Sequence, residues 1–296
     1  MHQYTVAVMG LGVRGKIHIH GLLENPERYR IVGLCDINEE VLKKVAQDNG
    51  LADVPQFTDA EAMLSATRPE IFVFVVAPEM RLNLVELGVK YGVKGISLEK
   101  PMAESLQEAK AMVDLCHENG IKAVVCHQQK YLSQMRALKK RIEDGEIGEV
   151  RKIHVECQAW FSQLGTHYVD YLLWANGGHR AKWVCGHVHG PICLDDNHPA
   201  PDYLLGTLEL ENGVHGYVEC GYLAEAHNPP EYGSSDNRLT VYGSEGYVYA
   251  ETDGFWGACT KATGGRLVTG KDPGWRNHQQ IPIQTPYYTE FADWMD

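Results

Sequence analysis

The chain has 296 residues, of which 44% are hydrophobic and 22% charged; this is the usage of an ordinary globular protein, and the length favours two domains over one. A formal net charge of -12 would repel phosphate groups, so we expect neither a nucleic acid nor a membrane surface as a partner. The longest apolar run, residues 71–77, is far shorter than the roughly 18 to 20 residues that span a bilayer, and no signal peptide is evident. We therefore expect a cytoplasmic protein whose 8 cysteines, none of them in a Cys-x-x-Cys pair, stay reduced.

The first half of the chain alternates short apolar runs with longer helical patterns, which is typical of parallel βαβ units. The expected strands are 5–9, 31–35, 71–76, 95–98 and 122–126. The clearest helices are 39–48, capped by Asn38 and followed by Gly50, and 106–118, capped by Ser105 and followed by Gly120. This half predicts a doubly wound parallel sheet.

The second half changes pattern after about residue 128. A helix over 133–143, a strand over 149–159 and a short helix over 167–175 come first. Antiparallel strands follow: Asn212-Gly213 between strands 204–210 and 214–220 predicts a type I′ hairpin, and a second hairpin joins strands 238–242 and 247–251. The sequence stops within an amphipathic pattern over 288–296, so we expect the natural C-terminus to lie beyond it.

A glycine-rich loop directly follows the first expected strand. Gly10-Leu11-Gly12-Val13-Arg14-Gly15 has the Gly-x-Gly-x-x-Gly spacing that permits a tight turn and lets a helix N-terminus approach a pyrophosphate. Asp36 ends the second strand, where a carboxylate accepts hydrogen bonds from the adenosine ribose. A 2′-phosphate would meet this negative charge, and neighbouring Ile37 and Asn38 offer no arginine, so we expect NAD rather than NADP.

Two further groups carry reactive side chains. Glu99-Lys100-Pro101 follows the strand over 95–98, so Lys100 is expected at the ligand crevice of the sheet. Gly165-Thr166-His167 begins a helix on which Asp170 lies near His167. By itself, His167 is more often a packing residue than a catalytic one.

Histidine pairs elsewhere do not predict a metal site. His18 and His20 are two residues apart on a helix and so point apart, and His187 and His189 share a strand face without an evident third ligand. We expect no metal.

Taken together, these motifs resemble the Gfo/Idh/MocA oxidoreductase family in order and spacing, over nearly the whole chain. The resemblance rests on the glycine loop with Asp36, on residues 99–101, on 127–131 followed by 145–149, and on 165–170. It implies an α/β Rossmann domain with a doubly wound parallel sheet, followed by an α+β domain with a large open, mostly antiparallel sheet. We place the NAD-binding domain at 1–124 and the substrate-binding and oligomerisation domain at 125–296.

The resemblance also implies the site residues. Lys100 and His167 become the catalytic candidates, beside a sugar or polyol carbon that loses hydride to nicotinamide. The implied cofactor-binding residues are Gly10, Leu11, Gly12, Val13, Arg14, Gly15, Asp36, Ile37, Ala77, Pro78, Glu99, Lys100 and Gln128. The implied substrate-binding residues are Lys100, Lys130, Trp160, Gln163, Thr166, His167 and Asp170.

Two positions depart from the family's pattern. Many of its dehydrogenases carry an aspartate four residues before the histidine, where this chain has Gln163, and an amide cannot stabilise an imidazolium as an ionised partner does. The Asn-Arg-Arg-Phe-like segment of the family is Gln128-Gln129-Lys130-Tyr131 here.

We therefore expect an NAD-dependent oxidoreductase that acts on a secondary alcohol of a sugar, polyol or glycoside, and that forms a homodimer or homotetramer. Two alternatives stay open. The first is an NAD-dependent glycoside hydrolase that works by transient oxidation and elimination, and the second is a non-catalytic NAD or sugar sensor. The presence of both Lys100 and His167 argues against the sensor.

Overall fold

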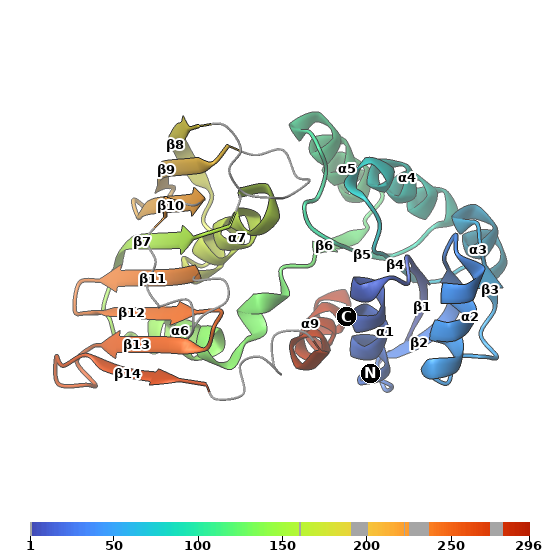
Figure 1. The fold of residues 1–296 in the computed structure, drawn as a ribbon, viewed down its shortest axis with the longest axis horizontal. Coiled ribbons are helices and arrows are strands. Elements are labelled where there is room, and N and C mark those ends of the chain that lie inside the picture. Colours follow the sequence, from blue (N-terminus) through green and yellow to red (C-terminus); the bar gives the residue numbers. More distant parts are fainter. Residues whose placement is uncertain (1, 160, 191–200, 222, 225–236, 273–280) are drawn as a thin grey trace. The chain divides into compact units, whose positions relative to one another are not determined.

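A computed structural model describes residues 2–159, 161–190, 201–221, 223–224, 237–272 and 281–296 (Figure 1). The chain forms two compact units, one made of residues 1–128 with 280–296 and the other of 129–279. None of the described helices is both long and apolar enough to cross a lipid bilayer.

The first unit is built on a parallel sheet of six strands in the order β3-β2-β1-β4-β5-β6, the order of a Rossmann fold. The predicted parallel sheet is confirmed. Its strands are β1 (Tyr4–Met9), β2 (Tyr29–Cys35), β3 (Gln56–Phe57), β4 (Ile71–Phe74), β5 (Gly95–Leu98) and β6 (Lys122–Val125). Its helices are α1 (Val13–Leu23), α2 (Glu39–Asp48), α3 (Ala60–Thr67), α4 (Arg81–Tyr91) and α5 (Leu106–Glu118), with short 3-10 turns η1 (Pro78–Met80) and η2 (Gln128–Tyr131).

Local signals account for the helix ends of this unit. The side chain of Asn38 accepts hydrogen bonds from Glu40 N and Val41 N, and that of Ser105 accepts one from Glu108 N. Helices α2 and α5 therefore have the predicted bounds. Apolar residues of α3, α4 and α5 pack on one face of the sheet, around Phe72 and Phe74.

The last helix, α9 (Ile281–Met295), belongs to the first unit. The sequence-based boundary at residue 124 had placed this segment in the second domain. It lies against α1, which is visible in Figure 1 as the red helix beside the blue one. Its tyrosines, Tyr287 and Tyr288, are almost fully buried, and Arg28 forms ion pairs with Asp293 and Asp296. The apolar face of α9 thus completes the core of the first unit after the chain has built the second.

The second unit is a mixed sheet of eight strands in the order β14-β13-β12-β11-β7-β10-β9-β8, in which only β7 and β10 pair in parallel. Its helices α6 (Ser133–Glu143) and α7 (Thr166–Ala175), together with the π-helix η3 (Phe161–Gly165), pack against it. The strands are β7 (Val150–Cys157), β8 (Ala181–His189), β9 (Tyr203–Leu210), β10 (His215–Gly221), β11 (Asn237–Gly243), β12 (Tyr247–Glu251), β13 (Phe255–Cys259) and β14 (Val268–Lys271). The predicted α+β unit with a mostly antiparallel sheet is confirmed.

The turn between β9 and β10 differs from the predicted type I′ turn. A type I′ turn needs positive φ at both central residues, whereas here Gly213 has φ +81 and Asn212 does not lie in the left-handed region. Gly213 N donates to Leu210 O at 2.9 Å, and Leu210 N donates to Val214 O at 2.8 Å. The loop is therefore one residue longer, and its single left-handed position is taken by the glycine.

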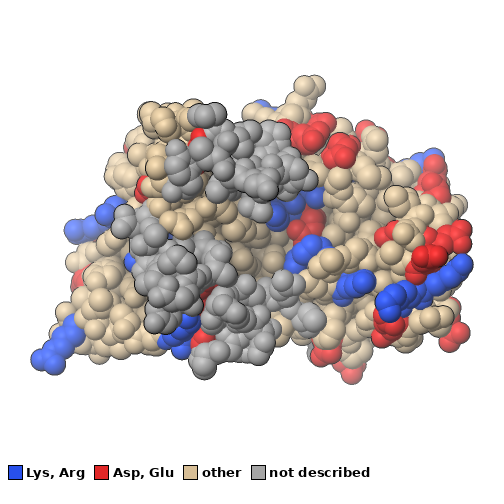
Figure 2. All heavy atoms as spheres, in the orientation of Figure 1, with Lys and Arg blue, Asp and Glu red and all other residues tan. Residues whose placement is uncertain are grey.

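Charged side chains are spread over the first unit. On the face shown in Figure 2, acidic and basic groups are interspersed over its helices and do not gather by sign. Several pair along one helix, as Lys43 does with Glu39.

Candidate functional site

The glycine loop sits between β1 and α1, and each glycine has its own steric reason. A Cβ on Gly10, which has φ +82, would lie 2.2 Å from Val75 O, and one on Gly15 would lie 1.9 Å from Gly10 O. A Cβ on Gly12 would meet no described atom within 4 Å. Gly10 and Gly15 therefore close the turn, while Gly12 leaves open space at the N-terminus of α1. That space, with the amide groups of the first turn, fits a pyrophosphate.

Asp36 follows β2 and lies against this loop. Leu11 N donates to Asp36 Oδ2 at 2.7 Å, and Asn38 N donates to Asp36 Oδ1 at 2.9 Å. The carboxylate is thus held at the loop and ready to accept further hydrogen bonds. Val13 and Ile37, on either side, are 77% and 84% exposed. This is a high exposure for aliphatic side chains, and a dinucleotide bound at the loop would cover them. The residues expected at the cofactor therefore fit an adenosine ribose and a pyrophosphate.

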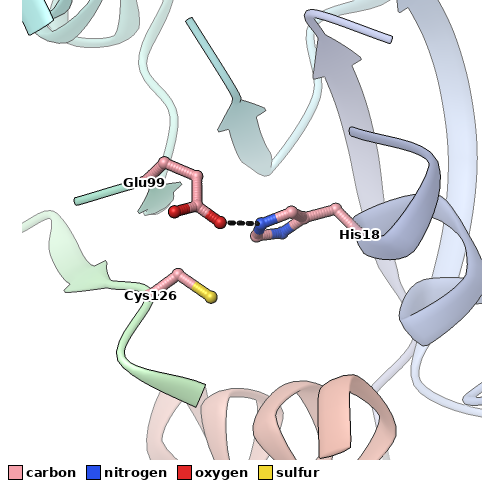
Figure 3. Close-up of side chains that lie close together, drawn as sticks. All are labelled: His18, Glu99 and Cys126. Carbon is pink, nitrogen blue, oxygen red and sulfur yellow. Dashed lines mark hydrogen bonds and ion pairs between the residues drawn. The ribbon is translucent and has the colours of Figure 1, made fainter. Parts of the chain in front are cut away.

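Arg14 and Glu99 form a second contact between distant parts of this unit. Arg14 Nε and Nη2 lie 2.9 and 2.8 Å from Glu99 Oε1, and His18 Nε2 lies 3.1 Å from the same oxygen (Figure 3). His18 Nδ1 in turn lies 2.6 Å from the hydroxyl of Tyr288 on α9. Glu99 thus faces α1, and a direct contact with the cofactor stays a prediction.

The protonation states of this network follow from burial and charge. Burial raises the pKa of Glu99, but the hydrogen bond from His18 and the charge of Arg14 outweigh it and hold that pKa well below its usual range. Burial lowers the pKa of His18 despite the carboxylate. Burial also raises the pKa of Cys126 to about 12. The site therefore holds an ionised carboxylate, a neutral imidazole and a neutral thiol at neutral pH.

His18, Glu99 and Cys126 also have the composition of a metal site, since their ligand atoms lie within 4.8 Å of one another. Figure 3 shows His18 and Glu99 turned toward each other, with Cys126 beside them. The guanidinium of Arg14, however, binds the same carboxylate oxygen as His18, and a cation there would face that positive charge. The geometry therefore favours a hydrogen-bonded ion pair.

Lys100 follows Glu99 in a loop that Arg81 holds in place. Arg81, which is 3% exposed, donates to the carbonyl oxygens of Val76, Glu99 and Pro101. Lys100 itself is partly buried. Ala77 and Pro78 lie beside this brace at the start of η1, and Gln128 is buried next to Cys126. The sequence motifs indicated neither Arg81 nor the role of His18, because the partners of both residues lie far away in the sequence.

In the second unit, His167 lies in the first turn of α7 and is 2% exposed. Its Nδ1 lies 3.0 Å from the hydroxyl of Tyr171, which donates to Gln129 Oε1 at 3.4 Å. Lys130 Nζ lies 3.4 Å from Asp170 Oδ2 on the same helix. The sequence indicated Asp170 as the acidic neighbour of His167. It placed Tyr171 near the site as an aromatic side chain but not as the partner of His167, although a spacing of four residues on a helix is a signal for contact.

The remaining predicted substrate residues are described in part. Thr166 Oγ1 is buried and has no hydrogen-bond partner within the described residues, so it could serve a ligand hydroxyl. Gln163 is one of the residues that form η3. Trp160 and the side chain of Gln163 lie outside the described residues, so their roles stay predictions. Lys100 belongs to the first unit, and His167, Lys130 and Asp170 belong to the second.

Known proteins share both sequence and fold with this chain. A D-apiose dehydrogenase of Paraburkholderia graminis is 33% identical over 241 residues, which cover 74% of this chain and 61% of that protein. A 2,7-anhydro-N-acetylneuraminate hydratase of Mediterraneibacter gnavus is 26% identical over 235 residues, covering 79% of this chain and 56% of that protein. The chain therefore spans only about three fifths of the length of these two relatives.

A crystal structure of an oxidoreductase from Agrobacterium radiobacter in complex with NAD+, L-tartaric acid and magnesium has the same fold, with a TM-score of 0.79 and 18% identity over 100% of this chain and 88% of that one. Residues 4–127 match the oxidoreductase family with an NAD-binding Rossmann fold, and residues 135–249 match the Gfo/Idh/MocA C-terminal domain. With both of its units matched in order, the chain belongs to the Gfo/Idh/MocA family of oxidoreductases.

Proposed function

We propose that this protein oxidises a secondary alcohol of a sugar, polyol or glycoside with NAD as the oxidant. The observation that carries the proposal is the tie between Asp36 and the glycine loop, because it holds a carboxylate beside the open space at Gly12. Relatives named as sugar and inositol dehydrogenases support the substrate class. On the face shown in Figure 2, acidic and basic groups are interspersed over the first unit, unlike the single-sign basic surface that binds a nucleic acid.

NAD, when bound, supplies the acceptor for the hydride that leaves the carbinol carbon. The protein must bind the adenosine ribose, hold the substrate and remove the hydroxyl proton. Asp36 would accept hydrogen bonds from the hydroxyls of the adenosine ribose, and a 2′-phosphate would prevent this. Lys100 or His167 takes the hydroxyl proton as the C–O bond becomes a carbonyl, so that the products are a ketone, NADH and a proton.

Charged and polar groups near His167 suit a carbohydrate. The Lys130 and Asp170 pair presents a donor and an acceptor, and the buried hydroxyl of Thr166 offers another polar group. Sugars carry several hydroxyls, each both donor and acceptor, so a set of this kind can orient a sugar.

A second candidate is an NAD-assisted elimination that returns the hydride before product leaves. A relative named as a hydratase favours it, since adding or removing water changes no net oxidation state. Gln163 in place of an aspartate is compatible with such a reaction.

One plate tests both candidates. The purified chain is mixed with NAD and a panel of sugars, polyols and aryl glycosides, and absorbance is read for NADH and for released phenol. Formation of NADH supports the dehydrogenase. Release of phenol without NADH supports the elimination, and NAD binding with neither signal would overturn both and favour a sensor.

A further inference from the structure

We propose that strand β8 is an interface between two copies of this chain, formed by antiparallel pairing with β8 of the partner subunit. The pairing joins the two eight-stranded sheets edge to edge, around a two-fold axis at Cys185. The proposal concerns the association of the second unit and does not depend on the reaction proposed above.

Strand β8 is one edge of the sheet of the second unit (Figure 1), and among the described strands it pairs only with β9. In an antiparallel pair, alternate residues direct their backbone N–H and C=O groups to the neighbouring strand, and the residues between them direct theirs away. All nine residues of Ala181–His189 are exposed. The outward backbone groups of β8 are therefore accessible to a further strand.

The opposite edge of the sheet, β14, has features that discourage pairing. It has four residues, and it contains Gly270 and ends in Lys271. Strand β8 has nine residues, and its sequence contains no proline, aspartate or glutamate. Its one lysine, Lys182, forms an ion pair with Glu209 on the neighbouring β9. The longer edge therefore lacks the usual protection against association with another strand.

The side of β8 that faces α7 is apolar. Val184 and Val188 are 68% and 60% exposed, a high fraction for valine side chains. Beside them lies an apolar cavity of about 330 Å³ between the sheet and α7, where Val169 and Leu173 form part of its wall. Apolar surface that is continuous in this way typically marks a contact with another molecule.

The order of side chains along β8 fits a second copy of the same strand. A two-fold axis at Cys185 places Val184 beside Gly186 of the partner subunit, so that a branched side chain meets a residue without one. On the other face of the sheet, it places Trp183 beside His187 of the partner subunit, and the two rings can pack.

The same axis is perpendicular to the sheet, so both copies keep α7 on one face of the joined sheet. The two apolar cavities then face each other across the paired strands. Such a pair is closed, because each copy covers the edge of the other and leaves no β8 edge for a third.

Crosslinking tests the position of the axis. Cys185 is exposed, and residues directly opposite each other in an antiparallel pair have Cβ atoms about 4.5 to 5.5 Å apart. Bismaleimidoethane, a short reagent that joins two thiols, should therefore convert the wild-type chain to a covalent dimer. Cys185→Ser should lose this product, and an equal yield in Cys185→Ser would overturn the proposal.

Sedimentation velocity over a series of protein concentrations tests the edge itself. Val184→Lys adds a charge at an exposed position, so the chain should fold and its dimer should dissociate at least about tenfold more readily. Val268→Lys is the matched control, because Val268 is a valine on the opposite edge strand, β14, and is 44% exposed. This control should associate as the wild-type protein does.

Hydrogen exchange locates the contact. Backbone amides of residues 181–189 should exchange more slowly at concentrations at which the dimer forms than in dilute solution, whereas those of 268–271 should not change. A wild-type chain that stays monomeric at every concentration would overturn the proposal and leave the cavity to an apolar ligand. A dimer that forms equally well in Val184→Lys, with slower exchange elsewhere on the sheet, would also overturn it.

Discussion

Two buried histidines, one in each unit, have the same kind of partner on Nδ1. His18 Nδ1 lies 2.6 Å from the hydroxyl of Tyr288, and His167 Nδ1 lies 3.0 Å from that of Tyr171. They differ in what surrounds the pair. The Nε2 of His18 donates to the ionised Glu99, so the hydroxyl of Tyr288 must donate to Nδ1. The hydroxyl of Tyr171, by contrast, lies 3.4 Å from Gln129 Oε1, an uncharged acceptor. The same two side chains therefore lie beside an ionised carboxylate in one unit and beside a neutral amide in the other.

This difference separates a structural histidine from one suited to a reaction. His18 is fully buried, and a carboxylate accepts the hydrogen bond from its only ring N–H. It ties α1 to the Glu-Lys-Pro loop and to α9. His167, by our proposal, is one of the two candidates that take the proton of the substrate hydroxyl. Burial and hydrogen bonding alone do not distinguish the two roles; the identity of the acceptors does.

Removing the charge of Glu99 should have the largest effect, a loss of stability of the folded protein. Glu99→Gln leaves Arg14 and His18 without their shared carboxylate, and loss of one partner of a buried pair costs about 3 kcal/mol of the free energy of unfolding, at the low end because Arg14 is 30% exposed. Urea denaturation measures it. Glu118→Gln, on the exposed end of α5, should cost almost nothing, and an equally small effect at Glu99 would refute this role.

A substitution of Lys100 tests whether this residue takes part in the reaction. Lys100→Met should lower kcat by about 100-fold, the scale of a proton-transfer group and equivalent to about 2.7 kcal/mol, while the melting temperature changes little. Steady-state NADH production and a thermal melt measure the two effects. Normal turnover, or a protein that no longer folds, would show that our assignment is wrong.

The charge of Asp36 sets the expected preference for cofactor. NAD should bind at least about tenfold more tightly than NADP, a difference of about 1.4 kcal/mol, because a 2′-phosphate would meet the carboxylate. Asp36→Ser should narrow the difference. Calorimetric titration with both dinucleotides decides, and equal affinities of the wild-type protein would count against the assignment.

His18 should add a pH dependence to stability. Because burial lowers its pKa, the unfolded chain takes up a proton near pH 6.5 that the folded chain does not, so this stabilisation is present above that pH and is lost as the pH falls. Between pH 7 and 5.5 the loss is at most about 1 kcal/mol. His18→Gln should flatten that part of the unfolding curve, whereas His117→Gln, exposed on α5, should leave it unchanged. If the free energy of unfolding of His18→Gln changed with pH as it does in the wild-type protein, this role of His18 would be ruled out.

Local sequence predicted most of the first unit because its signals act over a few residues. Asn38 and Ser105 cap the helices that they precede, and Gly10, with φ +82, is needed where the chain turns between β1 and α1. The partners of His18 could not be predicted in this way. Tyr288 is 270 residues away, on a helix that returns to the first unit after the second is complete.

The candidate site in the second unit was predicted in part. Motif spacing indicated His167. Asp170 was predicted as its partner because carboxylates are the usual partners of catalytic histidines. The position of Tyr171, one turn further along α7, was readable from helical periodicity. Its contact with Gln129 was not, since that residue lies 42 positions earlier in the chain.

Transfer of deuterium tests the central claim most directly. A substrate from the panel is labelled with deuterium at the carbon that bears the reacting hydroxyl, and the NADH formed is analysed by mass spectrometry. Our account predicts one deuterium in the nicotinamide ring of the NADH and a slower reaction than with unlabelled substrate. Unlabelled NADH, with the deuterium retained in the product or lost to water, would contradict hydride transfer from that carbon.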